Sequence, residues 1–127
     1  MKLRPINATT APAPVGGYAQ ALEVTGSVRR LYISGQIPVT RDGKLPSSFG
    51  DQAKLVWGHI AAQLEAAEMT TGNLVKVTIF LSDRRYATEN REARRIALED
   101  HAPALTVIIT GIFDEAWLLE IEAIAEA

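Results

Sequence analysis

Two glutamates near the C-terminus, Glu120 and Glu122, are the residues of this sequence best suited to acid–base chemistry. They lie in residues 118–125, where apolar residues alternate as in a β-strand. Residues two apart on a strand point to the same side, about 7 Å from each other. Paired catalytic carboxylates have such spacings, but strand glutamates more often face solvent or an ion-pair partner. Spacing alone therefore makes Glu120 a candidate without giving it a role.

Other residue types that commonly do chemistry are sparse. The chain has no cysteine, which excludes disulfides, thiolate catalysis and cysteine-based metal sites. Neither of the two histidines, His59 and His101, has a second ligand at helical or strand spacing, so we expect no metal site. Ser34 has no paired base and is not a nucleophile candidate by itself.

Arginines cluster around a predicted helix that follows Asp83: Arg84, Arg85, Arg91, Arg94 and Arg95. Acidic residues alternate with them, so we expect a solvated, ion-paired helix face, with an anion site as the alternative. Asn90 differs, because it shares a face with Tyr86, Ala93 and Ala97, where a polar side chain needs a partner. It is either a local hydrogen-bonding residue or part of a pocket wall, and the sequence favours neither.

These residues need a scaffold, and the hydrophobic periodicity predicts one α+β domain over residues 1–127. Residues 1–16, rich in Pro, Ala and Thr, are expected to form an N-terminal arm. The following elements have the order ββαβαββ, with the two helices on one face of the sheet. Strands are predicted at residues 18–24, 30–36, 74–82, 105–113 and 118–125, and helices at about 50–69 and from 83 to the stop at Pro103.

Two local predictions accompany this scheme. Residues 114–117 have the composition of a turn and are predicted to join the last two strands as a hairpin. In the first helix, an apolar stripe that includes Val56 and Ile60 faces the core, and Gln52 is placed outside that stripe.

The sheet face that the helices leave uncovered has an intermediate polarity. Alternation places on it Tyr18, Gln20, Tyr32, Ser34, Gln36, Lys76, Thr78, Thr106, Thr110, Glu120 and Glu122. Solvated faces usually carry more charge, and buried faces carry less Ser, Thr and Gln. Ile108, Ile112, Leu118 and Ile124 share this parity and would be exposed in a monomer. We therefore expect other copies of the chain to cover this face, a solvent-facing sheet being the alternative.

Composition limits the partners. Of the 127 residues, 47% are hydrophobic and 22% charged, as in globular rather than disordered chains. The net charge of -2 gives no general attraction to nucleic acid or to an anionic membrane. No apolar run has transmembrane length, and none follows the first five residues as a secretory signal would require. We therefore expect a cytoplasmic protein, and neither nucleic acid nor a membrane as partner.

A set of segments carries an ordered pattern: APVGGYAQA at residues 13–21, SGQIP at 34–38, VKVTIFL at 75–81, YATEN at 86–90 and LEIEAIA at 119–125. In this order they resemble the motifs of the RidA/YjgF family, whose members are also called endoribonuclease L-PSP-like proteins. The matches extend over residues 11–125, nearly the whole chain. The sequence is therefore identified as a member of that family.

The resemblance implies a chorismate-mutase-like fold with a mixed sheet, and a homotrimer with ligand clefts between subunits. Members of the family hydrolyse reactive enamines and imines to a keto acid and ammonia, without a metal or cofactor. Residues that match Tyr18, Ser34, Asn90 and Glu120 line the cleft in those members. The resemblance makes Glu120 the residue that handles the water or the proton, with Tyr18 beside it, while Ser34 and Asn90 bind the substrate. One carboxylic acid in a sheltered cleft can both protonate an imine and position a water.

Position 105 departs from the family pattern. The family's deaminases have an arginine there that holds the substrate carboxylate in a bidentate pair, whereas this chain has Leu105. Loss of charge-assisted hydrogen bonds worth about 1.5–3 kcal/mol each weakens carboxylate binding. Val107 stands where cysteine is common, and Gly17 where a proline usually precedes the tyrosine. We expect Leu105 and Val107 to form an apolar wall of the substrate site, and we do not expect the typical 2-iminoacid deaminase activity.

Three functional hypotheses follow. The first is a divergent deaminase or hydrolase of this family, acting on a small enamine, imine or related metabolite at an intersubunit cleft. The second is a non-catalytic small-molecule-binding trimer, a sensor or carrier. The third is a ribonuclease, which agrees less well with the acidic balance and with the lack of a catalytic histidine pair. The sequence leaves open whether Arg84, Arg85, Arg91 or Arg94 supplies a replacement anion site.

Overall fold

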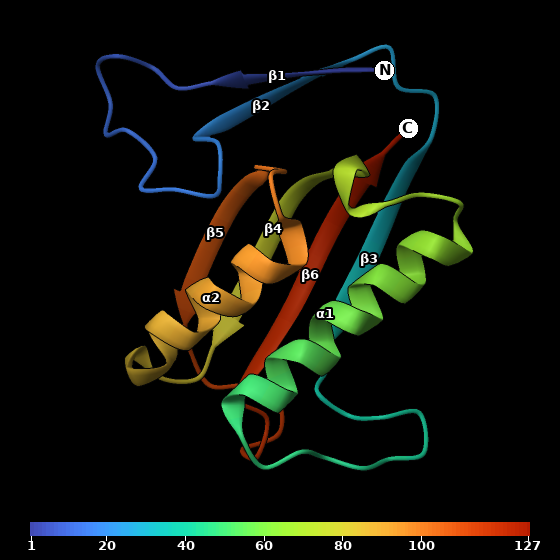
Figure 1. Ribbon diagram of the computed structural model, residues 1–127, viewed down its shortest axis with the longest axis vertical. Coiled ribbons are helices and arrows are strands. Elements are labelled where there is room, and N and C mark those ends of the chain that lie inside the picture. Colours follow the sequence, from blue (N-terminus) through green and yellow to red (C-terminus); the bar gives the residue numbers. More distant parts are fainter.

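The computed structural model describes residues 1–127 and contains a two-stranded and a four-stranded sheet with two α-helices. The strands are β1 (Lys2–Ile6), β2 (Ala21–Thr25), β3 (Arg30–Gln36), β4 (Leu74–Leu81), β5 (Ala104–Ile109) and β6 (Leu119–Glu126). The helices are α1 (Phe49–Ala66) and α2 (Ala87–Leu98), with the 3-10 turns η1 (Thr71–Asn73) and η2 (Arg84–Tyr86). The predicted α+β fold, with both helices on one face of a mixed sheet, is confirmed (Figure 1).

The four-stranded sheet has the order β3-β6-β4-β5. β6 runs antiparallel to both β3 and β4, and β5 runs parallel to β4. The predicted hairpin at residues 114–117 is therefore wrong, because β4 separates β5 from β6. A parallel β5 ends at the same edge of the sheet as β4, so the chain has to pass the end of β4 before it enters the sheet on the other side. Thr110 N donates to Leu81 O along this path, at 2.9 Å.

A buried glutamine holds the β5–β6 connection in place. The Gln52 amide on α1 donates to Pro46 O at 2.8 Å and Ala116 O at 3.1 Å, and it accepts from Leu118 N at 2.8 Å. Only 1% of Gln52 is exposed, so its predicted position outside the buried face is wrong. The amide is buried because it satisfies three backbone groups that have no partner in a helix or sheet. The strand predicted to reach residue 113 ends at Ile109.

The core lies between the helices and one face of the sheet. Ser48 begins α1 by accepting a hydrogen bond from Asp51 N at 3.2 Å. The buried side chains come from α1 and from alternate positions of the strands: Ala53, Val56, Trp57, Ile60, Leu64, Val77, Ile79, Leu81, Leu119, Ile121 and Ala123. Burial of each large aliphatic side chain contributes about 1.5–3 kcal/mol to folding. The rings of Phe49 and Tyr86 stack at 4.7 Å and join the starts of the two helical segments.

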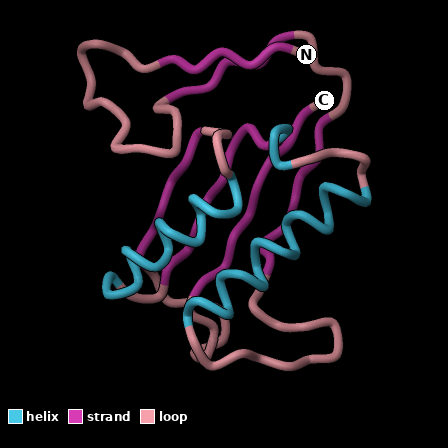
Figure 2. The backbone as a smooth tube through the Cα atoms, viewed as in Figure 1, coloured by secondary structure: helices cyan, strands magenta, loops and turns pink.

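The first residues form a strand within the segment predicted to be an arm. β1 pairs antiparallel with β2, from Lys2 opposite Thr25 to Ile6 opposite Ala21. Pro5 is tolerated because both strands of a two-stranded sheet are edges. The pair stands apart from the four-stranded sheet, so β3 has no strand along its outer side (Figures 1 and 2). Figure 2 also shows that the loops before β2 and before α1 lie at opposite ends of the molecule.

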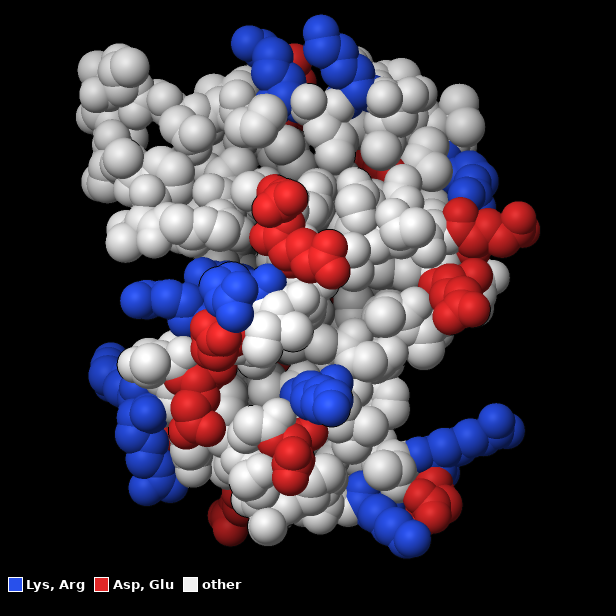
Figure 3. Space-filling view, viewed as in Figure 1, with Lys and Arg blue, Asp and Glu red and all other residues white.

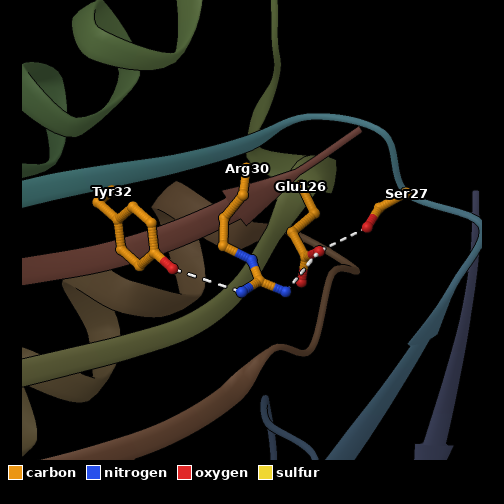
Figure 4. A network of polar contacts seen from close by, with 4 residues as sticks. All are labelled: Ser27, Arg30, Tyr32 and Glu126. Atoms are coloured by element: carbon orange, nitrogen blue, oxygen red, sulfur yellow. Dashed lines mark hydrogen bonds and ion pairs between the residues drawn. The ribbon is translucent and has the colours of Figure 1, made fainter.

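A buried carboxylate fixes the turn between β2 and β3 (Figure 4). Glu126 Oε1 accepts from Ser27 Oγ at 2.6 Å and pairs with Arg30 Nη2 at 3.3 Å. Arg30 Nη1 in turn donates to the Tyr32 hydroxyl at 3.4 Å. The Glu126 side chain is 7% exposed, so its carboxylate is shielded from water, whereas the Arg30 side chain is 55% exposed. The end of β6 thereby anchors the turn from which the β1–β2 pair departs.

Neither α-helix has the length and apolarity needed to cross a membrane.

Glu126→Ala should lower the free energy of unfolding by about 1–3 kcal/mol, because the Ser27 hydroxyl and the Arg30 guanidinium lose a buried acceptor. Urea unfolding followed by circular dichroism measures this change. Glu92→Ala is the control, since Glu92 forms an ion pair with Arg95 on the exposed side of α2. Equal shifts of the two unfolding midpoints would show that the buried network stabilises the protein no more than an exposed ion pair does.

Candidate functional site

The predicted site residues lie on opposite faces of the four-stranded sheet. Leu105 and Val107 of β5 stand beside Val77 and Ile79 of β4, which face the helices. Glu120 of β6 stands beside Phe80 of β4, one position out of phase with that core. Cross-strand neighbours share a face, so Glu120 points away from the helices while Leu105 and Val107 point toward them.

The helix-side group lines a cavity of about 460 Å³ between β5, α2 and the loop before β2. Four predicted site residues meet there, namely Tyr18, Asn90, Leu105 and Val107. The rest of the lining is Val15, Gln20, Leu81, Ala87, Arg91, Arg94 and Ile109. Seven of the eleven lining residues are hydrophobic, so the cavity fits a small ligand with an apolar body and a few polar groups.

The loop before β2 brings Tyr18 to this cavity. Ala19 N donates to Pro103 O at 3.0 Å, and Ala19 bridges to Ala104, so the loop follows the start of β5. The Tyr18 hydroxyl accepts a hydrogen bond from Val15 N at 3.2 Å. The prediction that Tyr18 and Gln20 lie on the free sheet face is wrong. β2 begins at Ala21 and pairs with β1, so these residues belong to a loop instead of a strand of the larger sheet.

Asn90 occupies the first part of α2 and is 3% exposed. Its Oδ1 is buried and has no hydrogen-bond partner within the chain. Of the two interpretations left open by the sequence, the structure places Asn90 in the pocket wall. A buried acceptor without a partner costs about 1–3 kcal/mol, so a donor on a ligand or a water molecule at this point would be stabilised.

Arg94, one turn further along α2, lines the same cavity and is 7% exposed. Burial, and secondarily the charge of Arg91, lowers the pKa of Arg94 from its ordinary value. The prediction of a solvated, ion-paired arginine face is right for Arg95, which pairs with Glu92 at 2.7 Å, and acidic and basic side chains are interspersed over the helix-bearing side (Figure 3). It is wrong for Arg94. The overlooked signal is the four-residue spacing from Asn90, which puts both side chains on one helix face.

Glu120 lies on the opposite side of the sheet, with its carboxylate against Gly35 of β3. A Cβ atom at position 35 would overlap that carboxylate, so Gly35 makes the space in which Glu120 lies. Burial, and secondarily the negative charge of Glu122, raises the pKa of Glu120. The neighbouring Ser34 is exposed. Ile33 pairs with Ala123 and Gln36 with Ile121, so Ser34 and Gly35 together oppose the single residue Glu122 in a bulge, which lets both face the side of Glu120.

A larger hollow of about 760 Å³ lies between α1 and α2 and includes the indole of Trp57. None of the predicted site residues lines it, so we assign the site by the residues that carry chemistry instead of by size. Each histidine contacts a backbone carbonyl, His59 at Val39 O (2.8 Å) and His101 at Leu74 O (2.6 Å). No group of three or more His, Cys, Asp or Glu side chains is arranged to bind a metal.

Comparison with known families adds independent evidence. Residues 8–127 match the family model described as endoribonuclease L-PSP. The chain belongs to this family. The chain is 34% identical to Protein HMF1 of Saccharomyces cerevisiae over 97% of its own length and 94% of that protein. It is 33% identical to the 2-iminobutanoate/2-iminopropanoate deaminase of Escherichia coli K12, over 91% of both chains.

A solved structure of a family member extends the comparison to three dimensions. The crystal structure of Escherichia coli TdcF with bound serine superimposes with a TM-score of 0.73. Its sequence is 30% identical to this chain, over 98% of each. The family therefore includes proteins named as imine deaminases and a protein solved with a small amino acid bound, on the fold described above.

Glu120→Gln should stabilise the chain increasingly as pH rises. A carboxyl whose pKa is raised on folding gives stability that is fully present below its unfolded pKa, about 4.3, and is lost as pH rises through the folded value. Glutamine does not titrate, so the midpoint difference between variant and wild type should grow from near zero at low pH to positive values at neutral pH. Thermal unfolding from pH 4 to 8 measures it, with exposed Glu65→Gln as a control for removing one negative charge. A pH-independent difference would refute the assigned environment of Glu120.

Proposed function

We propose that this chain is a deaminase that hydrolyses a small enamine or imine in a cleft between two subunits of a homotrimer. The observation that carries the proposal is the division of the site residues between two faces of one sheet. Glu120 and Ser34 lie on the free face, and Tyr18 and Asn90 lie on the helix side. One copy does not bring these groups to a single substrate, so a complete site requires a second copy.

Several exposed groups support such an assembly. On the free face, Tyr32 is 68% exposed and Ile108 is 40% exposed, more apolar surface than a solvated sheet face usually presents. β3 is an edge strand with no partner on its outer side, and it is also the strand against which Glu120 rests. Covering the free face would remove this surface from water and would deepen the burial that already raises the pKa of Glu120.

The chemistry of imine hydrolysis suits a carboxyl with a raised pKa. In its protonated form, Glu120 gives a proton to the imine nitrogen, and the resulting carboxylate takes a proton from water as the water oxygen attacks the imine carbon. The C–O bond forms and the C=N π bond is lost, which leaves a carbinolamine. Glu120 then gives the proton taken from water to the amine nitrogen, and the C–N bond breaks as the C=O bond forms. The hydroxyl proton returns to the Glu120 carboxylate, and the products are a carbonyl compound and ammonia. No metal or cofactor takes part.

The helix-side residues bind and orient the substrate in this proposal. Tyr18 sets a hydroxyl at the cavity, Asn90 offers an unpaired amide oxygen to an N–H donor, and Leu105 and Val107 contact the apolar part of the substrate. The name of the Escherichia coli relative, 2-iminobutanoate/2-iminopropanoate deaminase, supports a small imine as the substrate class.

Turnover of a reactive imine tests the activity. A pyridoxal-phosphate dehydratase generates the enamine in situ from serine or threonine, and semicarbazide traps what remains. Because Leu105 removes the family's carboxylate-binding arginine, the wild type should accelerate keto-acid release less than typical 2-iminoacid deaminases do, and Glu120→Gln should reduce that acceleration by about 10²–10⁴-fold. Glu122→Gln is the matched control, because it removes the exposed carboxylate two residues along the same strand. Turnover that survives Glu120→Gln would exclude the proposed role, and wild-type binding without product would indicate a carrier instead.

Complementation between two inactive variants tests the intersubunit site. Glu120→Gln and Asn90→Ala damage different halves of the cleft, so a randomly mixed trimer has about one quarter of its interfaces with both halves intact. Equal amounts of the two proteins, unfolded together and refolded, should therefore recover about a quarter of wild-type turnover. Simple mixing without unfolding is the control. If the refolded mixture stays inactive, each site belongs to a single chain.

A further inference from the structure

Arg94 is a cation in an environment that rarely accepts one without a partner. It is 7% exposed, and it takes part in no ion pair and no side-chain hydrogen bond within the chain. Arg95, the next residue, has its carboxylate partner in Glu92. A guanidinium largely removed from bulk water and without an acceptor is unfavourable, so an anion that pairs with it in the cavity would be stabilised. The guanidinium donors of Arg94 line the cavity that holds Asn90 and Leu105.

The loop opposite α2 is shaped to admit this guanidinium. The Cβ position of Gly17 lies 3.8 Å from Arg94 Nη2 and 3.9 Å from Nε, so the backbone at Gly17 packs beside the charged group. Gly17 has φ of +74°. Proline is fixed near -65° and cannot adopt that conformation. The glycine at a position where the family pattern has proline thus allows the loop to pass closely over Arg94.

The other lining residues define what the site would take. Arg91 is a second cation in the lining of the cavity, exposed and without an acidic partner. No Asp or Glu lines the cavity. The residues that β4 and β5 contribute to the wall, Leu81, Leu105, Val107 and Ile109, are all apolar. A small monocarboxylate with an apolar body fits this combination better than a phosphate group, whose second charge and larger hydration shell such apolar walls do not compensate.

We propose that Arg94 binds the carboxylate of a small apolar oxo or imino acid, from α2, in place of the arginine that the family pattern has at position 105 on β5. Two departures from the family pattern then have one explanation. Leu105 lacks the donor, Gly17 lets the loop pass closely over Arg94, and Arg94 itself supplies a planar pair of N–H groups suited to bidentate carboxylate binding. The carboxylate is thus bound by the opposite wall of the same cavity. The assignment rests on the proposed function for the imine chemistry, but the binding step itself needs no turnover.

Binding of an unreactive ligand pair tests the assignment. Full-length wild type and Arg94→Met are titrated calorimetrically with 2-oxobutanoate and with its neutral amide, 2-oxobutanamide. The wild type should prefer the carboxylate, and Arg94→Met should lose about 10- to 100-fold in affinity for it while binding the amide as before. Arg95→Met, on the same helix but outside the cavity, should behave as wild type. Carboxylate preference that persists in Arg94→Met would overturn the proposal, as would a wild type without any preference.

Thermal unfolding of the same variants distinguishes a binding role from a structural one. Methionine retains the apolar stem and removes a buried, unpaired charge, so Arg94→Met should unfold at or above the wild-type midpoint in the absence of ligand. A structural role predicts a clear loss of stability instead. Where Arg94→Met does not fold, Arg94→Lys decides in the same assay, because a point charge without the planar fork should retain a reduced carboxylate preference.

Introducing an arginine at position 105 tests whether carboxylate binding can be rescued in Arg94→Met. Leu105 lines the same cavity, so Leu105→Arg added to Arg94→Met should recover the carboxylate preference. A folded double variant that recovers none would show that the two positions do not serve one ligand group. These outcomes are independent of the deaminase assay. Loss of carboxylate binding in Arg94→Met supports the proposed role of Arg94 even if the wild type has no turnover. Turnover by the wild type together with unchanged carboxylate binding in Arg94→Met refutes the role of Arg94 and leaves the proposed deaminase activity standing.

Discussion

The alternation of side chains along β6 is the constraint on which the arrangement of this molecule depends. β6 is paired on both sides, with β3 and with β4, and its residues Leu119, Ile121 and Ala123 are buried under the helices. A period of two then leaves Glu120 on the other face. A shift by one residue would bring Glu120 into the core and expose three apolar side chains. The packing that stabilises the fold therefore also separates the carboxyl from the cavity, and this separation is the basis for proposing a site shared between chains.

The sequence predicted best those elements whose pattern is local. β4 was expected at residues 74–82 and runs from Leu74 to Leu81, because its run of β-branched and aromatic residues has no competing helical period. The pairing of strands was harder to predict. Consecutive strands usually pair, but the crossover through α2 places β5 parallel to β4. The composition of residues 114–117 gives no sign of this pairing. β1 lies in the segment whose Pro, Ala and Thr content predicts an arm, and its Pro5 is tolerated because the β1–β2 pair is isolated.

The candidate site could be predicted by residue but not by position. Tyr18, Asn90, Leu105 and Val107 come from three separate segments, and the ordered motifs were enough to select them. Their relation to Glu120 depends on which face each strand presents, which is a property of the packed sheet. Arg94 lies in a segment with charged residues of both signs, and this composition predicts a solvent-exposed helix face instead of a buried side chain. Its burial follows from the docking of the loop at Gly17 against α2, a contact between residues 77 positions apart in the sequence.

The isolation of the β1–β2 pair has a consequence for local unfolding. A two-stranded sheet is marginally stable alone, whereas a strand bonded on both sides opens only with the sheet around it. The loop that carries Tyr18 starts and ends in the marginal pair, and β6, which carries Glu120, is bonded on both sides. The free energy of local opening should therefore be lower for β1 and β2 than for β6. We expect the amide hydrogens of the N-terminal pair to exchange faster than those of β6, the strand that holds the Glu120 carboxyl in place.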